Sequence, residues 1–439
     1  MRGFLRSWWL WSSVAVWLYW LERYAGALIA ATVSYVVFHL SAKWHPAIYP
    51  LESIADIESV SFHATMAGVT GMPLIPGNRV AIYNNGDEFY PAMLEAIESA
   101  TLSITMEQYI FWDGEVGRRF AEAFAQKARQ GVSVKLLLDA VGSSTLGPEI
   151  FRILEAGGCQ LAWFRPIHWY TLHPAHERNH RKSVIVDGRI AFTGGAGFGD
   201  QWLGSAGNPK EWRDIQIGIE GPAAVAQQTG FVQNWMASTG EIVAGPRYFP
   251  STPDAGSVAV QTILSSPITG AGAVGTMYLV ALQSAKRSLN IANSYFIPDS
   301  RVIEMLAEAC RRGVIVKVLV AGKHNDTWLA RQNSVRRYGD LLRAGVEIYE
   351  FQPTMLHQKI MIVDGLWATV GTANFDNRSF ALNEETNVCV HDPGLVDDLS
   401  AAFLADLVRS KQIHLRGWKR RGLWQKIKEQ CAALVEDQM

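Results

Sequence analysis

The sequence has few cysteines and few charged residues for its length. Only four of the 439 residues are cysteines, and no two of them are close in the chain. This excludes a disulfide-rich scaffold and a Cys-rich zinc site, and it is typical of a reducing compartment. Charged residues make up 18% of the chain, and 40 Lys and Arg nearly balance 41 Asp and Glu. That balance argues against a globally basic nucleic-acid-binding protein.

Hydrophobic residues and tryptophan are abundant instead. Hydrophobic residues make up 49% of the chain, and 16 residues are tryptophan. Many tryptophans together with little charge favour contact with lipid. The length exceeds that of one ordinary domain and predicts two domains or a duplicated one.

The first 45 residues differ from the rest. Residues 7–21 and 24–42 contain no Asp, Glu, Lys or Arg, and only Glu22 and Arg23 separate them. A bilayer span needs roughly 20 apolar residues, so the second run qualifies alone. We expect residues 1–45 to be a retained membrane anchor, a helical hairpin whose flanking cations keep both ends cytoplasmic. One or two crossings remain open, as do a cleaved secretory signal and a buried soluble helix, although no clean small-x-small cleavage site follows.

The other end of the chain is basic. Residues 409–428 hold eight Lys or Arg and no acidic residue, whereas residues 1–408 carry a net charge of −6. Tryptophan, leucine and isoleucine lie among these cations. The mixture suits the surface of an anionic membrane. The alternative is a solvated basic helix with no further role.

Between the two ends the chain repeats itself. The segment RQGVSVKLLLD at 129 matches RRGVIVKVLVA at 311, and HRKSVIVDGRIAFTGGA at 180 matches HQKIMIVDGLWATVGTA at 357. Two further matches, SATLSI with SAKRSLNI and LEAGGCQL with LRAGVEIY, keep the same order. We expect an aromatic strand to follow the first of these pairs, at 109 and at 295. Alternating helix and strand patterns predict α/β units whose helices cover a buried sheet.

We therefore divide the chain into an anchor, two similar domains, a linker and a tail. The linker is rich in Gly, Pro and Ser. The boundaries are 1–45 for the anchor, 46–236 for the first domain, 237–257 for the linker, 258–408 for the second domain and 409–439 for the tail.

Each repeat carries the motif His-x-Lys-x4-Asp. The residues are His180, Lys182 and Asp187 in the first copy and His357, Lys359 and Asp364 in the second. A lone histidine is more often structural, but here the same spacing recurs at matching positions. A phosphodiester reaction needs a nucleophile, a proton donor for the leaving alcohol and cations for the phosphoryl oxygens. Two histidines and two lysines can supply these roles, so no metal or other cofactor is expected.

This pair of motifs resembles the phospholipase D superfamily, and further segments are similar to the bacterial cardiolipin synthases. Those segments are WRDIQIGIEGPAAV at 212, SYFIPD at 294 and GTANFDNRSFALNEETN at 371. The resemblance implies two phospholipase D-like α/β/α sandwich domains related by pseudo-twofold symmetry, next to the N-terminal helical anchor. It also implies a phosphatidyltransferase of the cell inner membrane, with its catalytic domains facing the cytoplasm. The substrates would be phospholipids such as phosphatidylglycerol, and nucleic acid is not an expected partner.

The resemblance also assigns roles to residues. It implies a covalent phosphohistidine on His180, with His357 as acid and base, although sequence does not distinguish the two. Glu385 would orient a histidine, and the repeat places Asp214 opposite it; an ordinary salt bridge is the alternative for each. We expect Asn374 and the hydroxyl of Thr372 to contact phosphoryl oxygens.

Three further residues leave questions open. Asp187 and Asp364 are better suited to bracing strand ends than to proton transfer. Glu107 either faces the site or lies at an exposed edge.

One position departs from the family pattern. Gly197 stands where the family has asparagine in the first copy, so one amide donor is missing there. Aromatic residues such as Trp112, Trp163 and Trp169 could contact lipid or nucleic acid.

The alternatives to a cardiolipin synthase either use the same phosphodiester chemistry or have no catalytic activity. A phospholipase D hydrolase, a phosphatidylserine synthase and a membrane-tethered nuclease would use the same motifs. A catalytically inactive lipid-binding scaffold would not.

Overall fold

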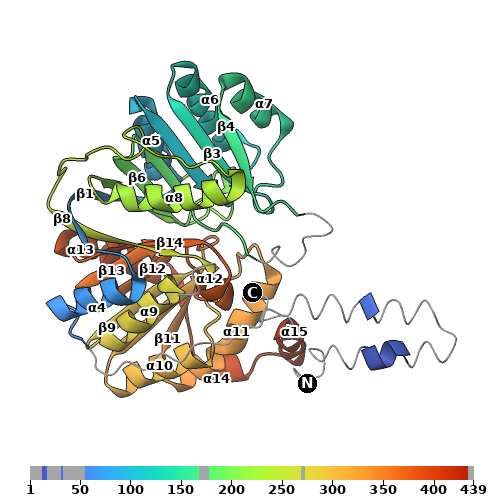
Figure 1. Cartoon of the computed structure of the whole chain (residues 1–439). Coiled ribbons are helices and arrows are strands. Elements are labelled where there is room, and N and C mark those ends of the chain that lie inside the picture. Colours follow the sequence, from blue (N-terminus) through green and yellow to red (C-terminus); the bar gives the residue numbers. More distant parts are fainter. Residues whose placement is uncertain (1–11, 17–30, 33–54, 168–176, 268–271, 434–439) are drawn as a thin grey trace.

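The computed structural model describes residues 12–16, 31–32, 55–167, 177–267 and 272–433 (Figure 1). The anchor predicted over residues 1–45 lies almost wholly outside these ranges, and so does Trp169. Of the helices within the described ranges, none is both long enough and apolar enough to cross a bilayer.

The described strands form one continuous 15-stranded mixed sheet. The strands of the first half are β1 (Ile75–Asn84), β2 (Ser103–Gln108), β3 (Ser133–Asp139), β4 (Gln160–Phe164), β5 (Ser183–Val186), β6 (Ile190–Gly194) and β7 (Ile215–Glu220). Those of the second half are β8 (Val258–Ser265), β9 (Ser288–Asn293), β10 (Ile315–Ala321), β11 (Glu347–Phe351), β12 (Lys359–Val363), β13 (Trp367–Gly371), β14 (Glu385–Val390) and β15 (Ser410–Ile413).

The two halves of the sheet have the same strand order. From the centre outwards the first half runs β1, β7, β6, β5, β2, β3, β4, and the second runs β8, β14, β13, β12, β9, β10, β11. The central strands β1 and β8 pair antiparallel, with Ile75 opposite Val260. In each half the last three strands are parallel and the others antiparallel. The matching order agrees with the repeat in the sequence.

Helices cover both faces of the sheet. Helix α4 (Val60–Thr70) comes first in the chain but packs in the core of the second half, against α9 (Ala273–Ser284). The first half contains α5 (Asn85–Ser99), α6 (Glu115–Arg129), α7 (Pro148–Gly157), η2 (Asp200–Trp202) and α8 (Ala224–Thr239). The second contains α9 (Ala273–Ser284), α10 (Ser300–Arg311), α11 (Trp328–Arg343), α12 (Asn377–Ala381), α13 (Pro393–Val408), α14 (Leu415–Lys419) and α15 (Leu423–Ala433). In β3, Leu136 packs into the same core as Phe120 of α6, whereas the next residue, Leu137, packs with Phe231 of α8. Because successive strand residues point to opposite faces, strands buried on both sides read as continuous hydrophobic runs.

Two strands predicted from the sequence are not strands. The sheet pairing ends at Gln108 in β2 and at Asn293 in β9, so the aromatic segments at 109 and 295 lie beyond it. They make only single bridges, Phe111 with Phe198 and Phe296 with Phe375. The reason in the first half is that the Phe111 N–H donates to Ser143 Oγ at 3.0 Å instead of continuing a ladder.

The C-terminal segment packs onto the second half. Its first residues form β15, which pairs antiparallel with β11 and places Lys411 opposite Glu350. Trp418 then lies against α11, where its Nε1–H donates to the carbonyl of Val335 at 2.9 Å. A Cβ at Gly339 would lie 2.2 Å from the Trp418 ring, so the missing side chain makes room for the indole.

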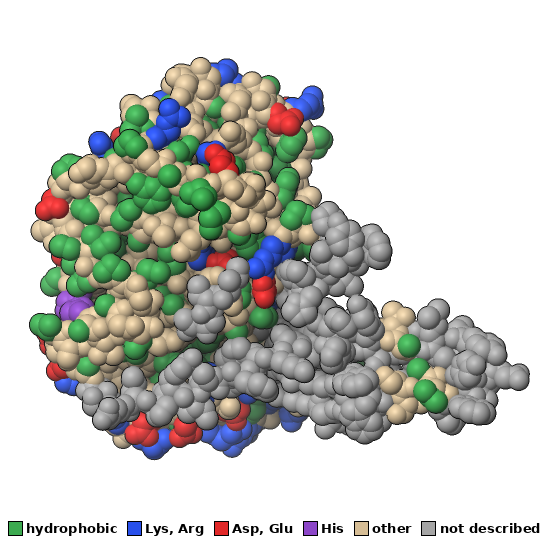
Figure 2. Space-filling view, in the orientation of Figure 1, with side chains coloured by type: hydrophobic (Ala, Val, Ile, Leu, Met, Phe, Trp, Pro, Cys, Tyr) green, Lys and Arg blue, Asp and Glu red, His purple; other side chains and the backbone are tan. Residues whose placement is uncertain are grey.

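The surface drawn in Figure 2 does not carry a belt of one charge. Charged side chains of both signs gather along the lower edge, near α10 and α14, and hydrophobic side chains are scattered above them. On the face drawn in Figure 2, the positive side chains of the described residues therefore do not form one continuous patch.

Candidate active site

Both halves line one cavity at the carboxyl ends of the parallel strands. Its volume is about 650 Å³. The first half contributes Tyr109, Ile110, Trp112, Val141, Gly142, Ser144, Thr145, Ile167, Arg178, His180 and Lys182. The second contributes Tyr295, Ile297, Asp326, Thr327, Ala330, His357, Asn374, Asp376, Arg378 and Asn383. The two motif histidines therefore face a common space.

His180 precedes β5 and is almost fully buried. Its Nδ1 lies 3.0 Å from both carboxylate oxygens of Glu385, at the start of β14. Because a carboxylate only accepts hydrogen bonds, Nδ1 donates and Nε2 keeps a free lone pair. The Tyr109 ring packs edge-on against the imidazole at 5.2 Å. Lys182 Nζ donates to the carbonyl of His180 at 2.9 Å.

His357 precedes β12 in the corresponding position. Its Nδ1 lies 2.9 Å from Asp214 Oδ2, which also accepts from Trp202 Nε1 at 2.9 Å. Lys359 Nζ lies 3.3 Å from His357 Nε2 and donates to Ser294 Oγ at 2.7 Å. A carboxylate thus fixes the orientation of each imidazole.

The histidine–carboxylate pairs cross between the halves. His180 of the first half pairs with Glu385 of the second, and His357 of the second pairs with Asp214 of the first. The backbone crosses in the same way, because the His180 N–H donates to the Glu384 carbonyl at 3.0 Å and the His357 N–H to the Arg213 carbonyl at 2.7 Å. Neither half holds a complete set of histidine and carboxylate.

Burial dominates the protonation of the four cationic groups. It lowers the pKa of His180 to about 4, although Glu385 acts in the opposite direction. It also lowers the pKa of Lys182 to about 7 and that of Lys359 to about 8, and it lowers the pKa of His357. Desolvation disfavours the charged form of such groups, and a bound phosphate would favour it again.

The two carboxylates stay ionised despite being buried. Burial alone would raise their pKa values, but the contact with His357 lowers the pKa of Asp214 below its ordinary value. The contact with His180 does the same for Glu385. Neutral imidazoles beside ionised carboxylates are therefore the resting state of the cavity.

The two residues expected to bind phosphate lie in different places. Asn374 lines the cavity, and its Oδ1 has no hydrogen-bond partner among the described residues. Thr372 is fully buried behind the cavity, where its hydroxyl donates to Glu385 Oε2 at 2.5 Å. The expectation that this hydroxyl contacts phosphate is corrected, because its proton is already committed to Glu385.

Asp187 and Asp364, the aspartates of the two His-x-Lys-x4-Asp motifs, do not line the cavity. Asp187 accepts hydrogen bonds from the N–H groups of Thr101, Leu102 and Ser103, each within 2.9 Å. Asp364 accepts from the N–H groups of 286–288 in the same way. Both have positive φ, at 51° and 57°. Each therefore ties a hairpin turn to the start of a neighbouring strand, a bracing role.

Gly197 leaves no room for the asparagine that the family has there. A Cβ at this position would lie 2.8 Å from Ile110 Cβ and 2.9 Å from its carbonyl oxygen. The Gly197 carbonyl accepts from the buried Tyr90 hydroxyl at 2.7 Å, which holds the backbone in place. The cavity is thus asymmetric, with Asn374 on one side only.

Sequence reasoning missed several polar residues around the cavity. Arg178, two residues before His180, is buried, and its Nη1 lies 3.6 Å from Asp139 Oδ1. Asp376, two residues after Asn374, also lines the cavity, and burial raises its pKa to about 6. Nearness to the motifs was the available signal for both.

Glu107 is not at an exposed edge. It is fully buried in β2, where its Oε2 accepts from Asn179 at 3.0 Å and from Asn234 at 2.9 Å. Burial raises its pKa. Asn179 is the residue before His180, so Glu107 supports the segment that carries this histidine. Within the described ranges, no group of three or more His, Cys, Asp or Glu is placed to hold a metal ion.

Comparison with known proteins places this arrangement among related chains. The family described as "Cardiolipin synthase, PLD-like domain" matches residues 93–225 and 278–407. A cardiolipin synthase from Listeria welshimeri is 34% identical over 368 residues, which cover 83% of this chain and 76% of the relative. Cardiolipin synthase 1 from Bacillus cereus is 34% identical over 374 residues, with 83% and 73% covered.

A solved structure shares the fold. The crystal structure of phosphatidylserine synthase from Haemophilus influenzae matches with a TM-score of 0.67, covering 86% of this chain and 99% of that chain. Its sequence identity is 14%, so the likeness concerns the fold alone.

Proposed function

The chain belongs to the cardiolipin synthase family with phospholipase D-like domains, and from that premise we propose that it synthesises cardiolipin. The reaction transfers a phosphatidyl group from phosphatidylglycerol, or a related phospholipid, to the terminal hydroxyl of another phosphatidylglycerol. With phosphatidylglycerol as donor, glycerol leaves. The chain is thus a phosphatidyltransferase of the phospholipase D superfamily.

One observation carries the proposal. His180 and His357 line one cavity, each with a carboxylate from the opposite half and a lysine two residues later. A double displacement at phosphorus needs two imidazoles that reach the same atom in different protonation states. The crossed pairs supply two imidazoles held in fixed orientations.

In the first step His180 is the nucleophile. Its Nε2 lone pair attacks phosphorus, a P–N bond forms, and the P–O bond to the leaving glycerol breaks. His357, protonated, gives its proton to the departing oxygen. The negative phosphodiester offsets the effect of burial on the pKa of His357, so the proton is available when substrate is bound.

In the second step the roles of His357 reverse. It takes the proton from the hydroxyl of the acceptor phosphatidylglycerol, whose oxygen attacks phosphorus. The P–N bond breaks, cardiolipin is released and His180 returns to its neutral form. Transfer instead of hydrolysis requires that water be kept from the phosphohistidine.

The other predicted residues support these steps. Lys182, Lys359 and the amide of Asn374 face the non-bridging oxygens as cationic and neutral donors. Thr372 supports Glu385 through its hydrogen bond. Asp187 and Asp364 hold the strands that follow the histidines, outside the reacting atoms.

We further propose that the domain division follows the repeat and that the two sandwich domains are related by pseudo-twofold symmetry. The matching strand orders support this. Residues 1–45 would anchor the enzyme in the cell inner membrane with the catalytic domains in the cytoplasm. A protein that alkaline washing releases from membranes, or that protease reaches from outside the cell, contradicts this placement.

The test of the activity is lipid product analysis. Purified full-length protein is given phosphatidylglycerol vesicles, beside His180→Ala and His357→Ala variants. We expect cardiolipin and glycerol from the wild type and no product from either variant. Phosphatidic acid alone would identify a hydrolase, and absence of any product from the folded wild type would contradict the proposed activity.

A further inference from the structure

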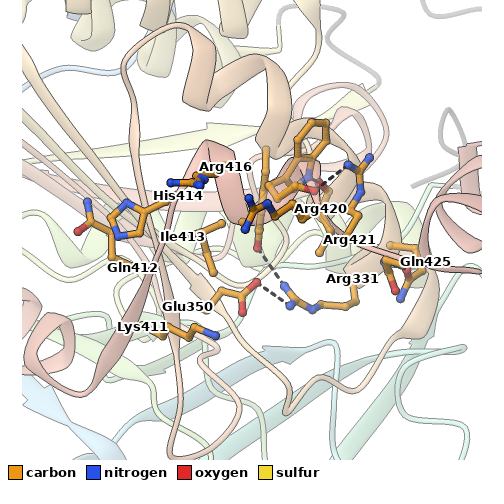
Figure 3. A pocket seen from close by; sticks show the side chains of 15 residues that line it. Arg331, Glu350, Lys411, Gln412, Ile413, His414, Arg416, Arg420, Arg421 and Gln425 are labelled. Atoms are coloured by element: carbon orange, nitrogen blue, oxygen red, sulfur yellow. Dashed lines mark hydrogen bonds and ion pairs between the residues drawn. The ribbon is translucent and has the colours of Figure 1, made fainter. Parts of the chain in front are cut away.

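A second cavity lies outside the catalytic centre, between α11 and the C-terminal segment (Figure 3). Its volume is about 930 Å³. We call it the basic groove. Its lining residues are Arg331, Gln332, Val335, Tyr338, Glu350, Lys411, Gln412, Ile413, His414, Arg416, Gly417, Trp418, Arg420, Arg421 and Gln425.

More cationic than anionic side chains line the groove. Its lining holds five Lys or Arg and one carboxylate. Arg331 is paired with Glu350 at 2.6 Å, as the dashed lines in Figure 3 mark, and Arg421 is paired with Glu429 at 2.8 Å. The remaining three are exposed and have no carboxylate within ion-pair distance in the described part of the chain: Lys411, Arg416 and Arg420. These three side chains give the groove a net positive charge, which attracts an anion.

Apolar surface adjoins these cations. Trp418 and Tyr338 form part of the groove wall, and the Trp418 ring is fixed by its hydrogen bond to α11. On α15, beside Gln425 of the lining, Leu423 and Trp424 are 73% and 76% exposed. Ile427 is one turn after Leu423 and is also exposed. Cations beside exposed tryptophan and leucine are the combination that binds an anionic bilayer surface.

The groove does not belong to the duplicated unit. It is built on β15, which covers the outer edge of β11, whereas β4, the matching strand of the first half, ends the sheet. Strand β15 and the groove beside it therefore have no counterpart in the first half of the sheet. Helix α11 joins the two cavities, because Ala330 lines the catalytic one and the next residue, Arg331, lines the groove.

We infer that the basic groove binds the phosphate of an anionic phospholipid that remains in the bilayer and is not the reacting substrate. Lys411, Arg416 and Arg420 receive the phosphate, while Leu423 and Trp424 enter the apolar layer. Binding there brings α11, and with it the mouth of the catalytic cavity, to the membrane surface. This site does not depend on the proposed reaction.

The test compares two triple variants of the full-length protein. The groove variant is Lys411→Ala/Arg416→Ala/Arg420→Ala. The matched control is Lys419→Ala/Lys426→Ala/Lys428→Ala, which removes the same charge from exposed positions of the same segment outside the groove lining. Hydrogen exchange of peptides covering residues 410–428 is followed while phosphatidylglycerol is titrated into phosphatidylcholine–detergent micelles. Inorganic phosphate at matched concentration is a separate arm.

We expect phosphatidylglycerol to protect these peptides in the wild type and the control, with about tenfold or more weaker affinity in the groove variant. Inorganic phosphate should give no protection, and added salt should weaken the binding. Equal weakening in both variants would mean diffuse attraction and would overturn the site. Protection by inorganic phosphate would overturn the lipid assignment, and an unaffected groove variant would overturn both. Phosphohistidine formation in the groove variant, measured separately, keeps this result distinct from failure of the proposed reaction.

Discussion

Single residues in the cavity owe their protonation states mainly to burial. The pKa of His180 falls to about 4 and that of Lys182 to about 7 because both lose contact with water. A neutral His180 is the form that attacks phosphorus, and a charged Lys182 is the form that stabilises the phosphoryl oxygens. The two residues need opposite protonation states, so they limit activity at opposite ends of the pH scale.

The resulting prediction concerns the pH dependence of kcat/KM, which reports the free enzyme. Activity should fall as pH drops through about 4, because His180 becomes protonated. It should also fall as pH rises, first because His357, whose pKa burial lowers, loses the proton that the leaving oxygen needs, and then through about 7, because Lys182 loses its proton. Lys182→Arg should remove the part of the alkaline fall near pH 7, at a lower maximum rate, since guanidinium stays charged but is shaped differently, and should leave the part that His357 causes. A profile that is flat on both sides of pH 7 contradicts this assignment.

A second residue-scale prediction concerns the crossed carboxylates. Glu385→Gln and Asp214→Asn keep the shape but replace an acceptor with a possible donor, so the facing Nδ1 no longer needs its proton. We expect kcat to fall about a hundredfold or more in each, in line with the effect of such a change on other catalytic histidines. Thermal unfolding serves as the control and should show that both variants fold. Glu385→Gln should slow the formation of phosphohistidine. If the variant formed phosphohistidine at the wild-type rate, Glu385 would not be needed to orient His180.

At the scale of elements, each Asp-Gly hairpin turn locks a motif strand in register. Residues with φ > 0 are uncommon outside glycine, and aspartate tolerates this region better than most. Asp187 occupies it while its carboxylate holds three backbone N–H groups. The motif aspartates therefore act on strand placement.

We predict that Asp187→Ala lowers the free energy of unfolding by about 2 kcal/mol or more, because three backbone donors lose a charged acceptor. The activity of the protein that remains folded should stay near the wild-type value. Denaturant unfolding and kcat at low temperature measure the two effects. Asp187→Asn, which keeps an acceptor and tolerates positive φ, is the control and should lose less stability. Loss of kcat without loss of stability would place Asp187 in the chemistry.

For the whole molecule, much of the fold followed from the repeat. The α/β class and the equivalence of the two motifs are visible in the sequence because the offset between matching segments stays between 177 and 188 residues. The crossing of Glu385 to His180 and of Asp214 to His357 was not predictable, since alignment of the repeats shows equivalence and not contact. The segments at 109 and 295 look like strands because aromatic residues favour strands. In the structure, Tyr109, Trp112 and Tyr295 line the catalytic cavity instead.

Other features depended on three-dimensional placement. A buried glutamate in β2 and an exposed one at an edge have the same sequence pattern, so burial of Glu107 needed the neighbouring Asn179 and Asn234 to be located. The C-terminal segment was recognisable as basic, but its strand pairing with β11 and the seat of Trp418 on Gly339 depend on long-range contacts.

The central claim is that one imidazole from each half acts on the same phosphorus atom, with His180 forming the covalent bond. The most direct measurement is to trap the phosphoenzyme with phosphate-labelled phosphatidylglycerol in His180→Ala and in His357→Ala, and to locate the label by peptide mapping. The account predicts label on His180 in the His357→Ala protein and none in the His180→Ala protein. Label on His357 in the His180→Ala protein would contradict it.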